Sequence, residues 1–167
     1  PSYAAWLESR GITAGGLAIP DWSEEGALEL MEAEGTATGI FSVSTPGVHL
    51  GDDIEARVKA REVNEFAAGV VSRNPGRFGF FATLTLPDVE GAIAELTYAM
   101  DTLRADGVVL ISNVRGTYLG YESWTPLFDE LNRRQAVVFI HPGDLPCEPV
   151  PGVPPYAADF LLDTTRA

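Results

Sequence analysis

Short apolar runs that alternate with amphipathic segments constrain the fold of this chain more than any other feature. Three of these runs begin at Gly79, Val108 and Val137, which are 29 residues apart. A continuous run of β-branched and aromatic residues is typical of a strand buried on both faces of a parallel sheet, and apolar residues at 3.6-residue spacing are typical of a helix. The alternation therefore predicts an α/β protein built from parallel β/α units.

Four strands are expected in this pattern. They cover residues 40–46, 78–86, 108–113 and 136–141, and the last is expected to be buried on both faces. Four strands are too few to close an eight-stranded barrel, so an open doubly wound sheet remains an alternative. No Gly-x-Gly-x-x-Gly or Walker loop follows any of these strands, which leaves a nucleotide-binding version of that alternative without support.

The helices expected between the strands begin at residues that are able to cap them. The candidate caps are Ser23 or Asp21 for one helix, Asp88 for a second and Ser123 for a third. A long helix that starts at Asp53 is expected to bury one stripe of apolar side chains. That stripe consists of Ile54, Val58, Val63, Phe66, Ala67 and Val70.

The two ends of the chain carry weaker patterns. Residues 1–20 show little periodicity and contain several glycines, which predicts an irregular surface segment. The proline-rich residues 142–155 predict no regular structure, because proline lacks the N–H that a helix or sheet needs. Asp163 is expected to be the N-cap of a final helix.

The composition limits the classes of partner. With 167 residues, 46 % of them hydrophobic and 21 % charged, the chain is long enough for one domain with its own core. No apolar run approaches the ~20 residues that cross a membrane. The net charge of −13 argues against a nucleic-acid partner, which would require stripes of Lys and Arg. The single cysteine, Cys147, fits a reducing cytoplasm.

His141 is a candidate for chemistry because it ends the last apolar run and is followed at once by a proline. The carboxyl ends of parallel strands are where barrel enzymes place their catalytic groups. A neutral imidazole that is held rigidly at such a position can bind a metal ion. The alternative interpretation is a histidine that only packs or hydrogen-bonds at the end of a strand.

Other polar residues are expected at the same edge of the sheet. Ser44 and Thr45 end the first predicted strand, and His49 lies in the loop that follows it. Ser112 and Asn113 end the third strand. Ser44, His49 and Asn113 are therefore candidates for contact with substrate oxygens. The alternative is that they cap or stabilise the turns in which they lie.

Nine short stretches, in order along the chain, together resemble one family. They are Ser42–His49, Val63–Glu65, Asn74–Gly79, Leu84–Asp88, Asp106–Val108, Asn113–Gly120, Pro126–Leu131, Phe139–Pro142 and Asp163–Arg166. The family is that of the amidohydrolase-related metal enzymes, which includes aminocarboxymuconate-semialdehyde decarboxylase and 6-methylsalicylate-type decarboxylases.

The resemblance implies that residues 1–167 are one partial domain, about the first half of a TIM (β/α)₈ barrel truncated at both ends. Members of the family hold a divalent metal, zinc or alternatively manganese. Their ligands are a His-x-His pair on the first strand, a histidine on a middle strand and an aspartate on the last. Phe139–Pro142 matches the middle strand, so the resemblance implies that His141 is a metal ligand. The other ligands would lie before Pro1 and after Ala167, so this part of the barrel is expected to be inactive alone.

The activity that the resemblance implies is a metal-dependent, non-oxidative decarboxylase. Such a carboxy-lyase would act on a small aromatic or muconate-type carboxylic acid in the cytoplasm. Two alternatives stay open: a hydrolase of an ester or amide, and a non-catalytic half-barrel that associates with another chain. The expected partners are a carboxylic acid substrate and either a second copy of the chain or the rest of the barrel.

Overall fold

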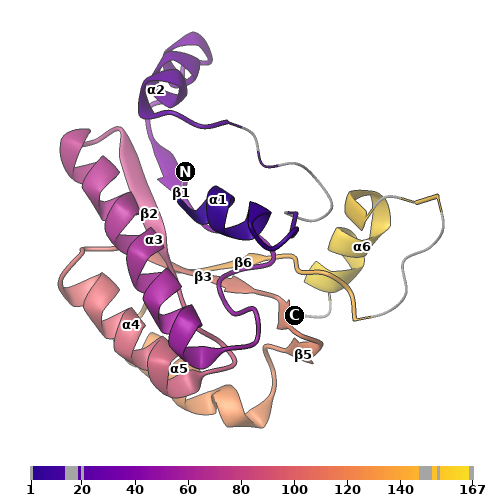
Figure 1. Ribbon diagram of the computed structural model, residues 1–167. Helices are drawn as coiled ribbons and strands as arrows, with labels where there is room; N and C mark the ends of the chain where they lie inside the picture. Colours follow the sequence, from indigo (N-terminus) through magenta and orange to yellow (C-terminus); the bar gives the residue numbers. More distant parts are fainter. Residues whose placement is uncertain (1, 14–18, 20, 147–151, 154, 166–167) are drawn as a thin grey trace.

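Four parallel strands form the sheet around which the chain folds (Figure 1). This computed structural model describes residues 2–13, 19, 21–146, 152–153 and 155–165. The strands are β1 (Gly39–Phe41), β2 (Phe78–Thr83), β3 (Gly107–Ile111) and β6 (Val138–His141). They lie in the order β1-β2-β3-β6, and every neighbouring pair is parallel. The predicted parallel β/α organisation is confirmed.

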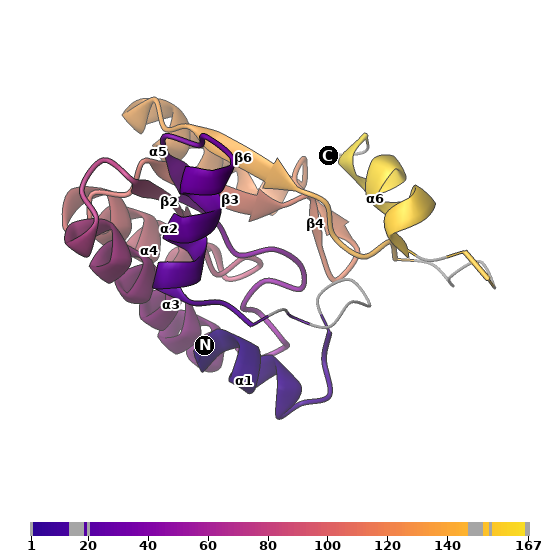
Figure 2. The same ribbon diagram turned by 90° about the horizontal axis from the view of Figure 1, so that it is seen from above.

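Three helices connect these strands and form a layer on one face of the sheet (Figures 1 and 2). They are α3 (Asp53–Arg73), α4 (Val89–Asp101) and α5 (Thr125–Arg134), the last preceded by the 3₁₀ turn η1 (Glu122–Trp124). The remaining elements are α1 (Ser2–Glu8), α2 (Glu24–Ala33), α6 (Pro155–Thr164) and an antiparallel hairpin of β4 (Asn113–Val114) and β5 (Thr117–Tyr118). None of the helices in the described ranges is both long and apolar enough to cross a membrane.

The hydrophobic core lies between the sheet and this helical layer. Phe80 and Ala82 of β2 are almost fully buried there, together with Val108 and Leu110 of β3. The helices contribute Ala92, Leu96, Ala99, Leu127 and Leu131. Because side chains alternate between the two faces of a strand, the residues between these core positions point to the opposite, open face of the sheet.

Two of the predicted helix caps are present. The Ser23 hydroxyl accepts a hydrogen bond from the Gly26 N–H (3.0 Å), and the Asp88 carboxylate accepts one from the Gly91 N–H (3.0 Å). Arg57 donates two further hydrogen bonds to Asp88, which hold the pKa of this carboxyl below its usual range. The predicted cap at Ser123 is wrong, because that residue lies inside the 3₁₀ turn that precedes α5.

The apolar stripe predicted for α3 is only partly correct. Val70 is fully buried, but Ile54 and Val58 are 77 % and 63 % exposed and Phe66 is 43 % exposed. The buried face is formed instead by Ala56, Ala60, Asn64 and Val70. Small side chains let the α3 backbone approach its neighbours closely, and this turns the larger β-branched residues of its first half outward.

The expectations for the two ends of the chain are only partly correct. Residues 2–8 of the predicted irregular segment form α1, whose Leu7 is fully buried. A single apolar anchor gives too weak a periodic signal to be recognised in the sequence. Asp163 does not cap a helix, because α6 already begins at Pro155 and Asp163 lies in its last turn. Residues 147–151 and 154 of the predicted proline-rich loop lie outside the described residues.

The strand that ends at His141 is not buried on both faces as predicted. Val138, Phe139 and Ile140 of β6 are 37 %, 42 % and 38 % exposed. The reason is topological: among the described residues, β6 is the last strand of the sheet and pairs with β3 alone. Its composition is that of a central strand, whereas its position in this chain is that of an edge strand.

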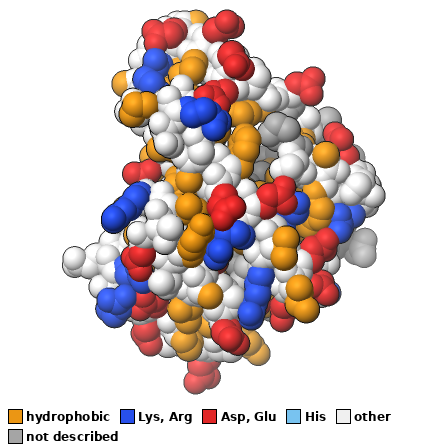
Figure 3. Space-filling view, turned by 60° about the vertical axis from the view of Figure 1, so that its left-hand side comes forward, with side chains coloured by type: hydrophobic (Ala, Val, Ile, Leu, Met, Phe, Trp, Pro, Cys, Tyr) orange, Lys and Arg blue, Asp and Glu red, His pale blue; other side chains and the backbone are white. Residues whose placement is uncertain are grey.

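Ion pairs tie the three outer helices together. Arg61 of α3 pairs with Glu95 of α4 (2.9 Å), and Arg134 of α5 pairs with Asp101 of α4 (2.7 Å). Acidic and basic side chains are interspersed over the face shown in Figure 3, with apolar side chains between them. In each pair one partner is largely buried, Glu95 in the first and Arg134 in the second, and the other lies at the surface. The pairs link α3 to α4 and α4 to α5.

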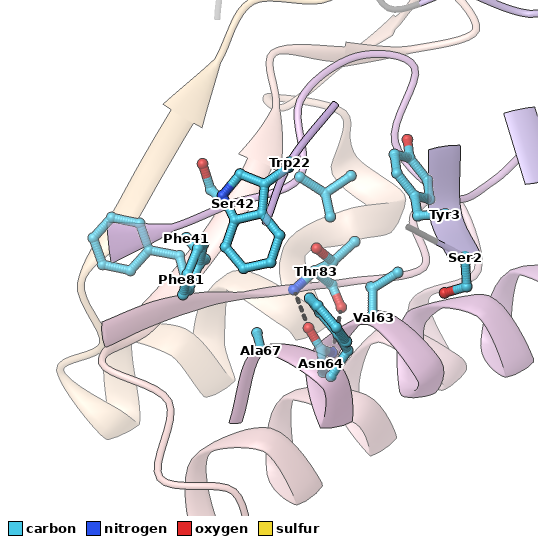
Figure 4. A pocket seen from close by; sticks show the side chains of 12 residues that line it. Ser2, Tyr3, Trp22, Phe41, Ser42, Val63, Asn64, Ala67, Phe81 and Thr83 are labelled. Carbon is cyan, nitrogen blue, oxygen red and sulfur yellow. Dashed lines mark hydrogen bonds between the residues drawn. The ribbon is translucent and has the colours of Figure 1, made fainter. Parts of the chain in front are cut away.

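A buried amide continues the sheet where β1 stops. β1 ends at Phe41, well before the predicted end of that strand, whereas β2 runs to Thr83. Asn64 of α3 accepts a hydrogen bond from the Thr83 N–H (2.8 Å) and donates one to the Thr83 C=O (3.0 Å), as Figure 4 shows. Its amide also donates to Glu95 of α4 (2.9 Å). The Asn64 side chain therefore takes the place of a neighbouring strand.

Replacing Asn64 with alanine should destabilise the protein. The change leaves the Thr83 N–H and C=O and one Glu95 oxygen without their partner, and each buried unsatisfied group costs about 1–3 kcal/mol. We expect the free energy of unfolding, measured by urea denaturation, to fall by about 3 kcal/mol. The matched variant Asn132→Ala, at an exposed position of α5, should stay within about 0.5 kcal/mol of the unaltered protein. Equal effects of the two variants would contradict this role of Asn64.

Candidate functional site

The loops that follow the four strands meet at the carboxyl edge of the sheet. His141 is the last residue of β6, and Ser112 and Asn113 directly follow β3. Ser44 and His49 lie in the loop after β1. Because the strands are parallel, all these residues belong to one edge, as the sequence predicts.

His141 points to the face of the sheet opposite the helical layer. Phe81 of β2 and Phe139 of β6 stack on that face with their ring centroids 5.8 Å apart. The His141 ring follows, with its centroid 6.3 Å from that of Phe139. A (β/α) barrel closes around this face, so His141 lies where the mouth of a complete barrel would be.

The hydrogen bond of the His141 ring determines which nitrogen is free. Its Nδ1 lies 2.8 Å from the Pro142 carbonyl oxygen. A carbonyl oxygen can only accept, so Nδ1 must carry the proton and Nε2 holds the lone pair when the ring is neutral. This is the arrangement found in metal-binding histidines, whose second nitrogen donates to a carbonyl or carboxylate.

The described part of the chain contains one candidate metal ligand, His141, but not a complete set of ligands. No group of three or more His, Cys, Asp or Glu side chains that could hold a metal ion occurs among these residues. A zinc site needs three or four ligands. In chemistry and tautomer, His141 fits the role of one such ligand.

A buried carboxylate connects α6 to the ends of β3 and β6. Asp163 is fully buried and accepts hydrogen bonds from the Ser112 hydroxyl, from the Asn113 amide (2.7 Å) and from the Gly143 N–H (2.6 Å). Sequence reasoning missed this role. The sequence did contain one indication of this role: Asp163 directly follows the apolar run Phe160–Leu162, where a solvent-exposed helix cap would not be expected.

Asn113 makes further hydrogen bonds within the same cluster. Its amide nitrogen also donates to the Asp144 carbonyl (3.0 Å), and its oxygen accepts from the Gly116 N–H (3.0 Å). The second contact closes the β4–β5 turn, in which Arg115 and Gly116 both have positive φ. These hydrogen bonds of Asn113 hold the loops at the carboxyl edge in place. Contact between Asn113 and a substrate stays a prediction.

His49 and Ser44 are placed differently. His49 is buried, and its Nε2 lies 2.8 Å from the Asp53 carboxylate. Its buried Nδ1 has no hydrogen-bond partner among the described residues. Ser44 is half-buried, and its hydroxyl lies 3.4 Å from the neighbouring Thr45 carbonyl. Substrate binding by either residue stays a prediction.

Two pockets open near these loops. One, of about 540 Å³, lies at the carboxyl edge and brings together two of the predicted site residues, His49 and Asn113, with Arg115 and Asp144. The other, of about 240 Å³, lies under β1 and β2 and is mostly aromatic and aliphatic (Figure 4). Its lining includes Tyr3, Trp22, Phe41, Val63, Phe66 and Phe81.

The Tyr3 side chain closes one side of the smaller pocket. Its hydroxyl donates to the Gly47 carbonyl (2.7 Å), which ties α1 to the loop after β1. Burial raises the pKa of Tyr3 above its ordinary value, so the hydroxyl remains a donor. The walls of this pocket therefore suit an apolar or aromatic group better than a charged one.

Residues 37–166 match the model of the amidohydrolase family. The chain belongs to this family. Its relatives include the decarboxylase yanB of Aspergillus niger, which is 43 % identical over 148 residues, and the 6-methylsalicylic acid decarboxylase acuB of Aspergillus aculeatus, which is 41 % identical over 140 residues. These matches cover 85 % and 81 % of this chain but 40 % and 42 % of the relatives. The chain therefore spans about two-fifths of the length of these relatives.

Solved structures share the fold of this chain. A crystal structure named amidohydrolase II matches 98 % of this chain and 55 % of its own, with a TM-score of 0.92 and 28 % identity. A dihydroxybenzoic acid decarboxylase from Polaromonas sp., solved with bound manganese, matches 93 % of this chain and 49 % of its own, with a TM-score of 0.71 and 24 % identity. The predicted partial barrel of the amidohydrolase type is confirmed.

Replacing Asn113 with aspartate should make stability depend on pH. The new carboxylate would face the Asp163 carboxylate at the 2.7 Å contact, and the pKa of one of them would rise above its ordinary value near 4. A raised pKa in the folded state means that stability is retained below about pH 4 and lost as the pH rises. We expect the deficit in unfolding free energy to be larger at pH 7 than at pH 4.

The matched control is Asn132→Asp, which places the same new charge at an exposed position of α5. Its unfolding free energy should follow that of the unaltered protein at both pH values. If Asn113→Asp also followed the unaltered protein, the Asn113–Asp163 contact would not be a buried hydrogen bond.

Proposed function

We propose that this chain forms part of a metal-dependent, non-oxidative decarboxylase that acts on a small aromatic carboxylic acid. The observation that carries the proposal is the identity of 41–43 % with decarboxylases over more than four-fifths of the chain. The position of His141 at the carboxyl edge, on the open face of the sheet, adds the geometry that such a reaction needs.

His141 would hold the metal through Nε2, because Nδ1 is engaged with the Pro142 carbonyl. When bound, a divalent metal supplies positive charge that stabilises negative charge developing on the substrate. We place zinc first and manganese second, since an imidazole ligand suits both. The Polaromonas enzyme holds manganese, but at 24 % identity that likeness shows a shared fold, so the metal proposal depends on His141.

A substrate carboxylate needs a cation in a chain with a net charge of −13. Most described Lys and Arg side chains lie within 4.0 Å of a carboxylate oxygen. Arg104 and Arg115 are the described cations without such a partner. Arg104 precedes β3 at the amino edge of the sheet, whereas Arg115 lines the 540 Å³ pocket at the carboxyl edge. We therefore assign the attraction of an anionic substrate to Arg115.

The proposed decarboxylation requires no oxidant. The bond between the ring carbon and the carboxylate carbon breaks, its electron pair stays on the ring carbon, and a proton takes the place of CO₂. The pocket whose lining includes Trp22, Phe41 and Phe81 supports the choice of an aromatic substrate. A reaction in the cytoplasm is part of the proposal and is supported by the single cysteine of the sequence.

Hydrolysis of an ester or amide is the second candidate, favoured by the amidohydrolase description of the matching family. The two reactions differ in their products. Incubation of the full-length protein with 6-methylsalicylate or 2,6-dihydroxybenzoate should release CO₂ from one of them. Cleavage of an aryl ester or anilide without any CO₂ release from these acids would favour the hydrolase instead.

Replacing His141 with alanine in the full-length protein should remove metal and activity together. A ligand at the exposed end of a strand contributes little to the core, so the melting temperature should remain close to that of the unaltered protein. A histidine that only packs would behave oppositely, with a loss of up to a few kcal/mol of stability and unchanged metal content. Metal analysis and thermal unfolding of the same variant, with Asn132→Ala as the control, distinguish these outcomes.

The chain of residues 1–167 alone should not retain metal. One imidazole binds zinc or manganese far more weakly than the three or four ligands of a complete site. After loading with zinc and dialysis, we expect elemental analysis to find well under one equivalent per chain. Stoichiometric zinc would show that residues other than His141 complete a site within this chain.

A further inference from the structure

The peptide group between Pro142 and Gly143 is hydrogen-bonded at both of its ends. Its C=O lies 2.8 Å from Nδ1 of His141, and its N–H donates to the Asp163 carboxylate at 2.6 Å. The group is planar and stiff, because its C–N bond has partial double-bond character. It therefore connects a buried carboxylate to the imidazole ring through one rigid unit.

The carboxylate at the far end of this connection is itself held firmly. Asp163 is fully buried, and besides Gly143 it accepts from the Ser112 hydroxyl and the Asn113 amide. Ion pairs among the described residues do not include Asp163. Its charge is thus stabilised by hydrogen-bond donors that are fixed to β3 and to the loop after β6, and charge-assisted bonds of this kind are stronger and shorter than neutral ones.

Glycine at position 143 lets the loop approach β3 closely. A Cβ atom there would lie 2.9 Å from the Ile111 side chain and 3.1 Å from the Asn113 carbonyl oxygen. At these distances a side chain fits only if the loop, Ile111 or Asn113 shifts. The Gly143 N–H also lies 2.9 Å from the Ser112 hydroxyl oxygen, so that the peptide group is held from the side of β3 as well.

We infer that Asp163 is a positioning residue for His141. It orients the Pro142–Gly143 peptide group, whose carbonyl then keeps the proton of the imidazole on Nδ1 and leaves the Nε2 lone pair for a metal ion. Histidine ligands commonly donate directly to a carboxylate, whereas here a peptide group lies between the two. The metal part of this inference rests on the proposed function, but the choice of tautomer does not.

The test is Asp163→Asn in the full-length protein. The amide has a similar shape, but its NH₂ group replaces one of the two oxygens on which three donors converge, so the hydrogen bond from the Gly143 N–H should be weakened. Long-range ¹H–¹⁵N correlation of the histidine rings in the metal-free protein should show His141 losing its Nδ1–H form. Zinc affinity, measured by chelator competition, should fall about 10- to 100-fold. Asp129→Asn, at an exposed position of α5, should leave both readouts unchanged.

Two further variants separate positioning from a general loss of structure. Gly143→Ala displaces the peptide group while leaving the carboxylate intact, and it should reproduce the loss of the Nδ1–H form. Ser112→Ala keeps the Asp163–Gly143 hydrogen bond, and it should retain this form. A folded Asp163→Asn protein with His141 still protonated at Nδ1 and with unchanged zinc affinity would overturn the inference. If that variant does not fold, retention of the Nδ1–H form in Gly143→Ala would overturn it.

Failure of this inference can be distinguished from failure of the proposed function. If His141→Ala left the zinc content unchanged, His141 would not be a ligand, and the metal part of the proposal would fall. The ring-nitrogen correlations of metal-free Asp163→Asn would still report whether Asp163 selects the tautomer. Conversely, Asp163→Asn could retain the Nδ1–H form of His141 while His141→Ala loses its zinc. That combination would refute the positioning role of Asp163 and leave the metal part of the proposed function standing.

Discussion

Two hydrogen bonds between the Asn64 amide and the backbone of Thr83 allow a three-residue strand to stand beside a six-residue one. Without them, the last N–H and C=O of β2 on that side would be buried without a partner, at about 1–3 kcal/mol each. The consequence reaches beyond β2. Because β1 can end early, the chain after Phe41 leaves the sheet and forms the loop that carries Ser44 and His49 across the carboxyl edge.

What could be predicted from the sequence is largely what local chemistry determines. The order of strands and helices and the caps at Ser23 and Asp88 follow from runs, periodicity and side-chain hydrogen bonding over a few residues. The position of His141 at a strand end was predicted in the same way. The stripe of α3 could not be, since the contrast between buried Ala56 and exposed Ile54 depends on how closely the helix approaches its neighbours.

In the candidate site, too, the positions of residues could be predicted from local sequence, whereas their tertiary contacts could not. Each loop residue at the carboxyl edge could be assigned to that edge, but not to a partner. Asp163 meets Ser112 and Asn113 across about 50 positions of sequence, and a local pattern contains no sign of such a contact. The exposure of β6 had a similar origin. Its β-branched composition is correct for a strand with neighbours on both sides, and the number of neighbours is a property of topology.

Stability alone does not explain the burial of two carboxylates, those of Glu95 and Asp163. Glu95 is paired with Arg61 and accepts from Asn64, whereas Asp163 accepts from three uncharged donors. Burying a charge costs several kcal/mol, and well-packed apolar residues can often replace such groups without loss. Hydrophobic contacts, however, are not directional, and a site for chemistry has to be held to within about 0.5 Å. Both carboxylates act on backbone amides next to the carboxyl edge, Glu95 through Asn64 on β2 and Asp163 directly on the loop after β6. Their hydrogen bonds are directional, unlike apolar packing, and they fix the backbone at the end of β2 and in the loop after β6.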